Sequence, residues 1–411
     1  MSNMKKIVIT GMGAVTPVGI GIDEYWKNIT EGKSGIDTIK TFDPSELAVQ
    51  IAGEVKNFNP SDYLAKDLIR KTDPFMQYAY VAAEEAIKQS GIEIEPERTG
   101  IIMGTAMSGV ATTAFTQDAL SGASHKKVGP RFIPKILGNI AAANIAIDYN
   151  IQGPSFTVST ACSSGGDAIN TACMCMQAGK ADVMLAVGAE SVLCPLVIYS
   201  LANAKALSRR NDDPKTASRP FDVTRDGFVI GEGGGALVLE TEEHALARGA
   251  KIYGEVKGCG NTCDAHHVTA PHPEGRGAIA CMKQALADAG IDASEIGYVN
   301  AHGTATNKGD TVETGAIKSV FGDKLPYVSS TKGATGHMMG AGGITETIAC
   351  VKAIETGIIP PTINLNEIDP ECEGIDFVPN TAKKADICYA MSNAFGFGGQ
   401  NSSIIVGKYE G

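Results

Sequence analysis

The segment VSTACSSGGDAI at residues 158–169 decides how the chain is interpreted, because it joins a strand to a helix at a cysteine. An apolar run ends at Cys162, and the small residues that follow can open a helix. A thiol there faces the free N–H groups and the positive dipole end of the helix, which favours the nucleophilic thiolate. Cys162 is thus either an acyl-carrying nucleophile or an ordinary buried cysteine, and both interpretations fit this segment.

Short β-branched runs alternate with helical patterns along the chain, which predicts an α/β fold with largely buried sheets. The order of elements in residues 1–250 is echoed in residues 251–411, so we expect two similar halves with a site at their junction. The expected strands are 6–10, 99–103, 182–187, 235–239, 252–257, 296–300, 327–329 and 403–406. The expected helices are 72–89, 165–178, 277–289, 310–320 and 343–356.

The composition is that of a globular protein, with 43% hydrophobic and 20% charged residues in 411. A net charge of -11 argues against nucleic-acid binding, which needs a positive surface. No apolar run approaches the roughly 18 residues of a membrane span, and the run before Gly11 is too short for a secretion signal. The 10 cysteines do not resemble a disulfide framework, so we expect a cytoplasmic protein in which all but Cys162 are small core residues.

Two histidines in similar surroundings favour the catalytic interpretation of Cys162. His302 lies in a strand-like run that ends in a Gly/Thr loop, and His337 ends a second run of small residues. A lone histidine is more often a core residue whose hydrogen bonds are all made, but two in similar surroundings are harder to explain in this way. The small residues around each would let a ligand approach. The glycine-rich segment at 392–401 either supplies oxyanion-stabilising N–H groups or is only a tight turn between strands.

Four motifs together resemble those of the elongating β-ketoacyl-acyl carrier protein synthases, close to the synthase II type. They are TACSSG around Cys162, AHGTAT around His302, TKGATGH ending at His337, and NAFGFGG ending at Gly399. The motifs come in family order, and the resemblance spans residues 7–406. It implies a thiolase-like, five-layered αβαβα fold built from two similar halves. It also implies a homodimeric condensing enzyme of fatty acid elongation.

The resemblance implies a role for each residue of the centre. Cys162 would accept an acyl chain from an acyl carrier protein, while His302 and His337 would hold the malonyl thioester as carbon dioxide leaves. The backbone N–H groups of Cys162 and Phe397 would stabilise the oxyanion. The substrates would be malonyl- and acyl-thioesters. No bound cofactor is implied, because phosphopantetheine arrives on the carrier protein.

Supporting roles follow from the same resemblance. Lys332 would organise the histidines, and Glu313 is expected to be its ion-pair partner, because a buried unpaired lysine is costly. Asp264 and His267 would support the site from a nearby loop. Substrate-binding positions would be Thr304 and Thr306 on the phosphopantetheine arm, Met107 as the gate of the acyl pocket, and Phe395.

A basic surface for the acidic carrier protein is expected despite the overall negative charge. Solvated surface charge is the plain alternative for these residues. The expected docking residues are Lys66, Arg70, Lys71, Lys126, Lys127, Arg131 and Lys205.

A zinc site is a competing interpretation of one short stretch. Four possible ligands occur close together, but they lack the second, separated ligand pair of most structural zinc sites, so we expect no metal. The four residues are Cys259, Cys263, His266 and His267.

Two further alternatives are weaker. The run IVITGMG at 7–13 resembles the start of a dinucleotide fold, but Thr16 stands where the third glycine belongs and Pro17 follows. A non-catalytic chain-length-factor relative would lack the nucleophile that Cys162 supplies.

The pathway stays open between two related functions. Enzymes of fatty acid elongation commonly have Thr where this chain has Gln400, and Ala or Thr where it has Ser163 and Ser164. The serine pair is similar to polyketide synthases. The alternative function is therefore that of a discrete polyketide or polyene ketosynthase subunit.

Overall fold

The main sheet path repeats one strand pattern in the two halves of the chain. In the computed structural model, which describes residues 5–121 and 128–411, the strands run in the order β6-β5-β7-β8-β1 and then, in mirrored sequence, β9-β15-β14-β10-β11. In each half the strand next to the outer end has two parallel neighbours, and the remaining pairings along the path are antiparallel. The strands are β1 (Ile7–Thr16), β5 (Thr99–Gly104), β6 (Ser155–Val158), β7 (Val183–Glu190), β8 (Gly233–Thr241), β9 (Gly254–Cys263), β10 (Ile296–Asn300), β11 (Tyr327–Ser329), β14 (Tyr389–Phe395) and β15 (Gln400–Gly407).

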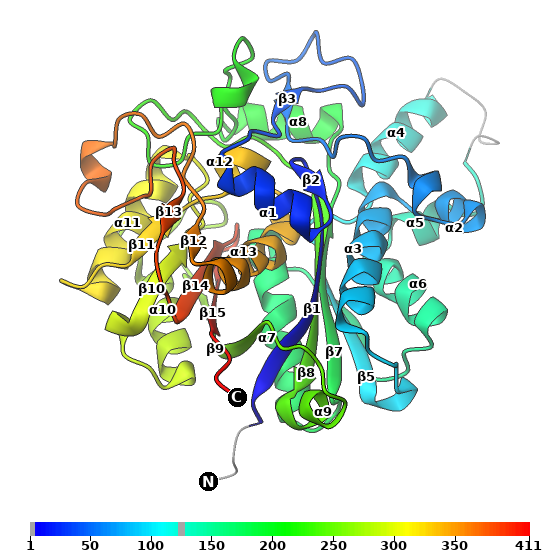
Figure 1. Ribbon diagram of the computed structural model, residues 1–411. Coiled ribbons are helices and arrows are strands. Elements are labelled where there is room, and N and C mark those ends of the chain that lie inside the picture. The colour runs from blue at the N-terminus through cyan, green and yellow to red at the C-terminus, as the bar shows by residue number, and fades with distance from the viewer. Residues whose placement is uncertain (1–4, 122–127) are drawn as a thin grey trace.

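The helices form three layers around the two sheet halves. Helices α7 (Ser164–Gln177) and α13 (Gly342–Thr356) lie in the centre and contact strands of both halves (Figure 1). Helices α3 (Pro74–Ser90) and α6 (Asn139–Tyr149) cover the first half, while α10 (Arg276–Ala289) and α11 (Asn307–Phe321) cover the second. This is the expected five-layered αβαβα arrangement, and the predicted fold class is confirmed. The division at residue 250 stays a prediction.

Shorter elements complete the fold and carry several loops of the site. The remaining helices are α1 (Ile22–Thr30), α2 (Lys66–Lys71), α4 (Val110–Ser121), α5 (Phe132–Ile136), α8 (Pro195–Asn203), α9 (Glu242–Ala247) and α12 (Lys332–Thr335). The remaining strands are β2 (Gly19–Ile20), β3 (Asp37–Thr38), β4 (Ile51–Ala52), β12 (Ile358–Ile359) and β13 (Lys383–Lys384).

Glycines bring the N-termini of the two central helices into contact. A Cβ atom on Gly165 would lie 2.9 Å from the backbone nitrogen of Ile344, and one on Gly343 would lie 2.4 Å from that of Gly166. Real Cβ atoms do not approach backbone so closely, so only glycine permits this packing. The turn that carries Cys162 and the segment after His337 are therefore neighbours.

Strand β1 is longer than the sequence predicts. It continues through Gly11 and Gly13 to Thr16, where we expected an end near residue 10. Helix α3 explains the glycines, because a Cβ on Gly11 would lie 2.1 Å from the carbonyl oxygen of Ala86. The glycines thus serve helix–strand packing inside a strand, and the dinucleotide-fold interpretation of residues 7–13 is wrong.

The expectation that all cysteines except Cys162 are core residues is only partly correct. Every cysteine has a free thiol, but Cys263 and Cys388 are exposed. Within the two described stretches, no helix is long and apolar enough to cross a membrane.

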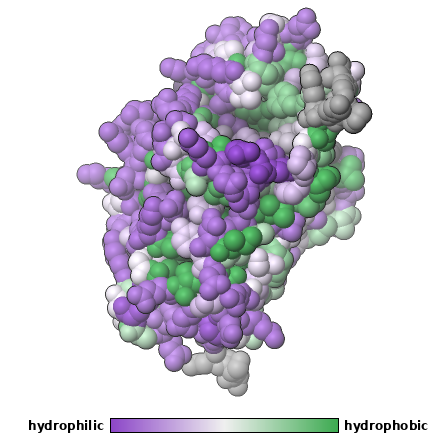
Figure 2. All heavy atoms as spheres, turned by 90° about the vertical axis from the view of Figure 1, so that its right-hand side faces the viewer, coloured by the Kyte–Doolittle hydropathy of each residue, from purple (hydrophilic) through white to green (hydrophobic). Residues whose placement is uncertain are grey.

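Strand β6 lies at one end of the sheet path, and apolar side chains are exposed around it. Figure 2 shows the face at the right of Figure 1, where apolar side chains gather among hydrophilic ones. Phe156 on β6 is 43% exposed and Ile147 on α6 is 75% exposed, and Ile133 and Leu137 around α5 are also exposed. Such a surface next to an unpaired strand edge is typical of an interface.

Candidate active site

Cys162 lies in a tight turn between β6 and α7. Ala161 before it has a φ of 52°, a left-handed conformation that non-glycine residues rarely adopt. The hydroxyl of Ser164 holds the turn, since it donates to the carbonyl of Ala161 at 2.7 Å and accepts from the N–H of Thr160 at 2.9 Å. The cysteine is thus presented on a strained, well-braced turn directly before a helix.

The segment 396–399 lies against this turn. A Cβ atom on Gly396 would lie 3.3 Å from the backbone nitrogen of Cys162 and 2.6 Å from the carbonyl oxygen of Thr160. The backbone N–H of Phe397 is aimed at the Cys162 thiol, while the Phe397 side chain is 40% exposed. The N–H groups expected to form an oxyanion hole therefore do meet at the cysteine.

The thiol of Cys162 is not poised as a thiolate, contrary to the sequence-based expectation. Burial raises its pKa to about 11, although the Phe397 N–H and the charge of Lys332 act in the opposite direction. Desolvation penalises the charged form, and here it outweighs the favourable donors. Burial therefore favours the neutral thiol.

His302 and His337 form a pair of neutral imidazoles. Their ring centroids are 5.3 Å apart with the planes at 87°. Burial, and then the positive charge of Lys332, lowers the pKa of each well below 6.5. Nδ1 of His302 and both ring nitrogens of His337 are buried and have no hydrogen-bond partner in the part of the chain described. Such orphaned groups are expected where a ligand completes the site.

The predicted ion pair between Lys332 and Glu313 is wrong. The Lys332 ammonium contacts Glu346 of α13, and both side chains are almost fully buried. Glu313 instead accepts the backbone N–H groups of His302 and Gly303 at 2.8 and 2.7 Å. The two carboxylates thus have different roles. Glu346 neutralises the lysine, and Glu313 fixes the loop of His302.

Thr304 and Thr306 lie together on the loop that follows His302. Their hydroxyl oxygens are 3.1 Å apart, and Thr304 is nearly buried. Arg225, which the sequence analysis did not identify, binds the backbone of this loop. Its guanidinium donates to the backbone carbonyls of Thr306 at 3.3 Å and Asn307 at 2.9 Å.

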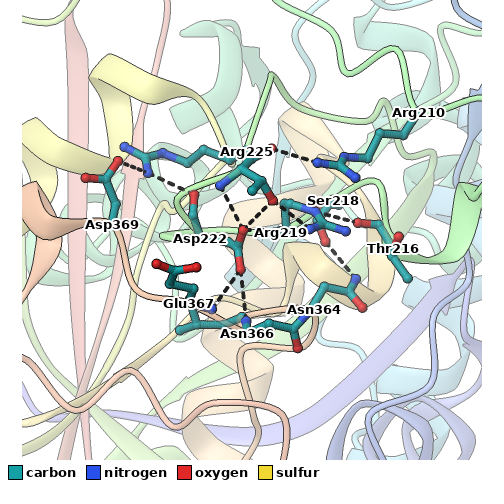
Figure 3. A network of polar contacts seen from close by, with 12 residues as sticks. Arg210, Thr216, Ser218, Arg219, Asp222, Arg225, Asn364, Asn366, Glu367 and Asp369 are labelled. Carbon is teal, nitrogen blue, oxygen red and sulfur yellow. Dashed lines mark hydrogen bonds and ion pairs between the residues drawn. The ribbon is translucent and has the colours of Figure 1, made fainter.

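Figure 3 shows Arg225 and Asp222 within a network of polar contacts. Arg225 also binds Asp369 at 2.6 Å, which ties the loop to a segment near the C-terminal end. Asp222 accepts backbone N–H groups of Asn366 at 2.9 Å and Glu367 at 3.1 Å. The segment RPFDVTRDGF at 219–228 carries this pattern of charges, but its partners are too distant in sequence to be predicted.

Of the two expected supporting residues, Asp264 contacts the 396–399 segment, whereas His267 does not support the site in this way. Asp264 accepts from the amide of Asn401 at 2.8 Å, and its own N–H donates to the carbonyl of Gly399 at 2.7 Å. It therefore braces the 396–399 segment. His267 is exposed, and its Nδ1 accepts N–H groups of its own loop.

Two of the residues considered as zinc ligands, Cys263 and His266, make other contacts. Cys263 lies 3.8 Å from the carbonyl of Gly398, and His266 packs against His272 at 4.9 Å. No group of three or more His, Cys, Asp or Glu side chains is placed to share a metal ion in residues 5–121 and 128–411.

Met107 and Phe395, two expected substrate-binding residues, lie on different segments of the chain. Met107 lies in the turn between β5 and α4, partly buried against a core cluster that contains Val197 and Ile198 of α8. Phe395 ends β14, with its ring centroid 5.9 Å from that of His302.

The basic residues expected to dock a carrier protein are only partly assembled. Arg70 and Arg131 line one cleft of about 330 Å³ together with Lys135, which the sequence did not single out. Lys66 and Lys71 are exposed on α2, and Lys205 is exposed after α8 without lining this cleft. Lys126 and Lys127 lie outside the described residues.

A cysteine on a helix-opening turn, two neutral imidazoles and a duplicated αβαβα fold define an acyl-transferring condensing enzyme. Two family models match the chain, the β-ketoacyl synthase N-terminal domain over residues 4–245 and its C-terminal domain over 253–366. The chain belongs to the β-ketoacyl synthase family.

Similar proteins cover the whole chain. It is 44% identical to a 3-oxoacyl-[acyl-carrier-protein] synthase 2 of Vibrio harveyi, over 98% of this chain and 99% of that one. A protein of the same name from Synechocystis sp. is 42% identical over the full length of both.

Solved structures agree on the fold. The ishigamide ketosynthase/chain length factor is 34% identical with a TM-score of 0.93, over 99% of this chain and 100% of that one. A type II PKS ketosynthase, solved with its acyl-carrier protein and bound to a hexaketide, is 31% identical with a TM-score of 0.90 over the same shares.

Proposed function

We propose that the protein catalyses a decarboxylative Claisen condensation between an acyl group on Cys162 and malonyl-acyl carrier protein, in fatty acid elongation. The unpartnered nitrogens of His302 and His337 carry this proposal. The charge of Lys332 acts on the pKa of Cys162 and of both histidines, so it lies near all three groups. Neutral imidazole N–H donors beside a cysteine suit an enolate that forms next to a thioester.

Acyl transfer is the first half of the reaction. The sulfur of Cys162 attacks the thioester carbonyl, the bond to the carrier thiol breaks, and the cysteine proton passes to the departing thiol. The N–H groups of Cys162 and Phe397 would stabilise the tetrahedral oxyanion. One such donor contributes roughly 3 to 4 kcal/mol to the transition state.

Condensation is the second half. The malonyl carboxylate leaves as carbon dioxide, and its electron pair forms an enolate whose oxygen accepts N–H groups of His302 and His337. The carbanion attacks the acyl carbonyl on Cys162. The carbon–sulfur bond then breaks to release the β-ketoacyl product, and the Cys162 thiolate takes up a proton from solvent. No bound cofactor takes part, because the pantetheine thiol comes with the carrier.

An acyl carrier protein is the proposed partner, docked on the basic side chains around α2 and α5. Arg70, Arg131 and Lys135 converge on one cleft. Asp67 pairs with Lys71 at 2.7 Å and approaches Arg131 to 4.0 Å, but exposed pairs of this kind are weak and yield to an acidic partner. The solved ketosynthase complex with an acyl-carrier protein supports this class of partner.

We also propose a homodimer that forms through β6, and a cytoplasmic location that the free thiols support. The strand edge and the exposed Phe156 would pair with the same surface of a second chain. Sedimentation should give a dimer for the native chain and a monomer for Phe156→Lys. A native monomer would contradict this part of the proposal.

The function is tested by incubating the protein with carrier proteins that bear acyl chains of four to eighteen carbons. The masses of the peptides that contain Cys162 are recorded before and after malonyl-carrier protein is added. We expect acylation on Cys162 and its discharge as a product two carbons longer. Cys162→Ala should abolish both steps, while Cys162→Gln should retain some malonyl decarboxylation. Condensation by either variant would remove Cys162 from its role.

A polyketide pathway is the second candidate, and the two solved structures named above favour keeping it. The same panel of acyl chains separates the candidates. Loading of saturated long chains supports fatty acid elongation. Loading of Cys162 only by β-ketoacyl or polyene chains, added to the panel, supports the polyketide function.

A further inference from the structure

Glu190, the last residue of β7, is a fully buried carboxylate without a cationic partner in residues 5–121 and 128–411. All its partners are neutral donors on two other segments. It accepts the hydroxyl of Thr105 at 3.0 Å and the backbone N–H groups of Ala106 at 2.6 Å, Met107 at 3.1 Å and Gly340 at 3.2 Å. One carboxylate therefore holds the 105–107 turn and the segment after His337 together.

The two segments pack closely against each other and against Glu190. A Cβ atom on Gly340 would lie 2.8 Å from Oε2 of Glu190 and 2.8 Å from Cα of Thr105. Met339 beside it has a φ of 45°, a strained value that its surroundings must maintain. The hydroxyl of Thr105 also accepts the N–H of Ser108 at 3.2 Å, which extends the network beyond Met107.

The chemistry of the partners explains why a carboxylate occupies this position. Every partner donates a hydrogen bond, and a carboxylate is the side chain that only accepts. Burial raises the pKa of Glu190 to about 7, while the N–H groups of Ala106, Met107 and Gly340 oppose this shift. An amide of the same shape would place its NH₂ group against a donor.

We propose that Glu190 is a positioning residue that holds Met107 at the mouth of the acyl pocket and so determines how well long acyl chains load. The proposal rests on the function proposed above and on the gate role that the family resemblance implies for Met107. A short acyl chain would not pass Met107, whereas a long one would. Glu190 would therefore affect long chains selectively.

The test compares Glu190→Gln with Glu85→Gln by the rate at which Cys162 is acylated. Glu85 is a matched control, because it too accepts backbone N–H groups, of Ala14 and Ile22, without a cationic partner among the described residues. For Glu190→Gln we expect loading of a twelve-carbon chain to fall about tenfold, the effect of one hydrogen bond to a charged group. Four-carbon loading and malonyl decarboxylation should stay within about twofold. Glu85→Gln should change neither.

The variant Met107→Ala shows through which residue Glu190 acts. In that background Glu190→Gln should lose most of its effect on long chains, since the gate is already gone. Thr105→Val, which removes one donor, should give a smaller shift in the same direction and serves if Glu190→Gln does not fold. An equal loss for both chain lengths, or a full effect without Met107, would overturn the proposal. If Met107→Ala itself leaves chain-length preference unchanged, the gate assignment fails instead.

Discussion

The Lys332 ammonium is neutralised by Glu346 of α13, and both groups are almost fully buried. Burial lowers the pKa values of His302 and His337 most, and the positive charge of Lys332 lowers them further, so both effects favour the neutral rings. Burial raises the pKa of Glu346, and the lysine opposes that shift. The ion pair thus places a positive charge near the imidazoles without leaving it unpaired.

Removing one member of this pair should destabilise the protein. We expect Glu346→Gln to lower the free energy of unfolding by about 3 to 5 kcal/mol, because a buried ammonium loses its partner. The double variant Lys332→Met with Glu346→Met should recover most of this loss, since no charge remains buried. Urea denaturation of the native protein and the two variants measures both effects. A loss under about 1 kcal/mol in Glu346→Gln would mean that water reaches Lys332.

Glu313 should matter for one half-reaction only. Its carboxylate clamps the N–H groups of His302 and Gly303, and a glutamine would face one of them with its own NH₂ group. We expect Glu313→Gln to slow malonyl decarboxylation about tenfold and to change acylation of Cys162 little. Glu355→Gln, whose partners are Lys251 and Lys352, is the control. Equal loss in both half-reactions would show a general distortion.

The contrast between Glu313 and Glu346 shows what the sequence predicts well. Strands 296–300 and 327–329 were predicted with the bounds that the structure has, because both are short β-branched runs before Gly- or Ser-rich loops. The motif cysteine and histidines were found because small residues surround them. Glu346 lies inside an apolar helix and has no local signal that marks it as the partner of Lys332.

The same limit explains why the packing role of the glycines of β1 was not predicted. Gly11 and Gly13 look like a phosphate-binding turn by local pattern, and only the approach of α3 shows their packing role. Glu190 and Arg225 were missed for a related reason. Their partners are backbone groups of distant segments, which leave no trace in the residue types nearby.

Both site histidines should remain neutral as the pH falls through 6.5. Their pKa values are lowered, so the neutral form persists below the pH at which an ordinary histidine becomes charged. Ring nitrogen NMR of protein with its 7 histidines labelled should show two rings that do not titrate between about pH 8 and 6. Comparison with His302→Ala and His337→Ala assigns them. Titration of either ring near 6.5 would contradict the neutral pair.

Arg225 should affect substrates that carry the full phosphopantetheine arm. It holds the carbonyls of Thr306 and Asn307, and a lysine cannot span both sites. We expect Arg225→Lys to raise the KM for acyl-carrier protein several-fold, with little change for a short thioester that lacks most of the arm. Arg219→Lys is the matched control, because Arg219 is also nearly buried but binds Thr216 and Thr224. A similar KM change in both variants would assign the effect to the network as a whole.

The contact between the central helices should tolerate no added methyl group. A Cβ on Gly165 would lie 2.7 Å from the carbonyl oxygen of Gly340 and 2.9 Å from the nitrogen of Ile344, and backbone atoms cannot move aside singly. We therefore expect Gly165→Ala to lower the free energy of unfolding by about 2 kcal/mol or more.

Gly315 on α11 provides the opposite case. No atom lies within 4 Å of the Cβ that an alanine would add there. Gly315→Ala should raise the free energy of unfolding by about 0.5 to 1 kcal/mol, because it reduces the entropy of the unfolded chain without strain. Denaturant midpoints of the two variants against the native protein measure both effects. If Gly165→Ala were as stable as Gly315→Ala, α7 and α13 would have to lie farther apart, and the placement of Cys162 beside the His337 segment would fail with them.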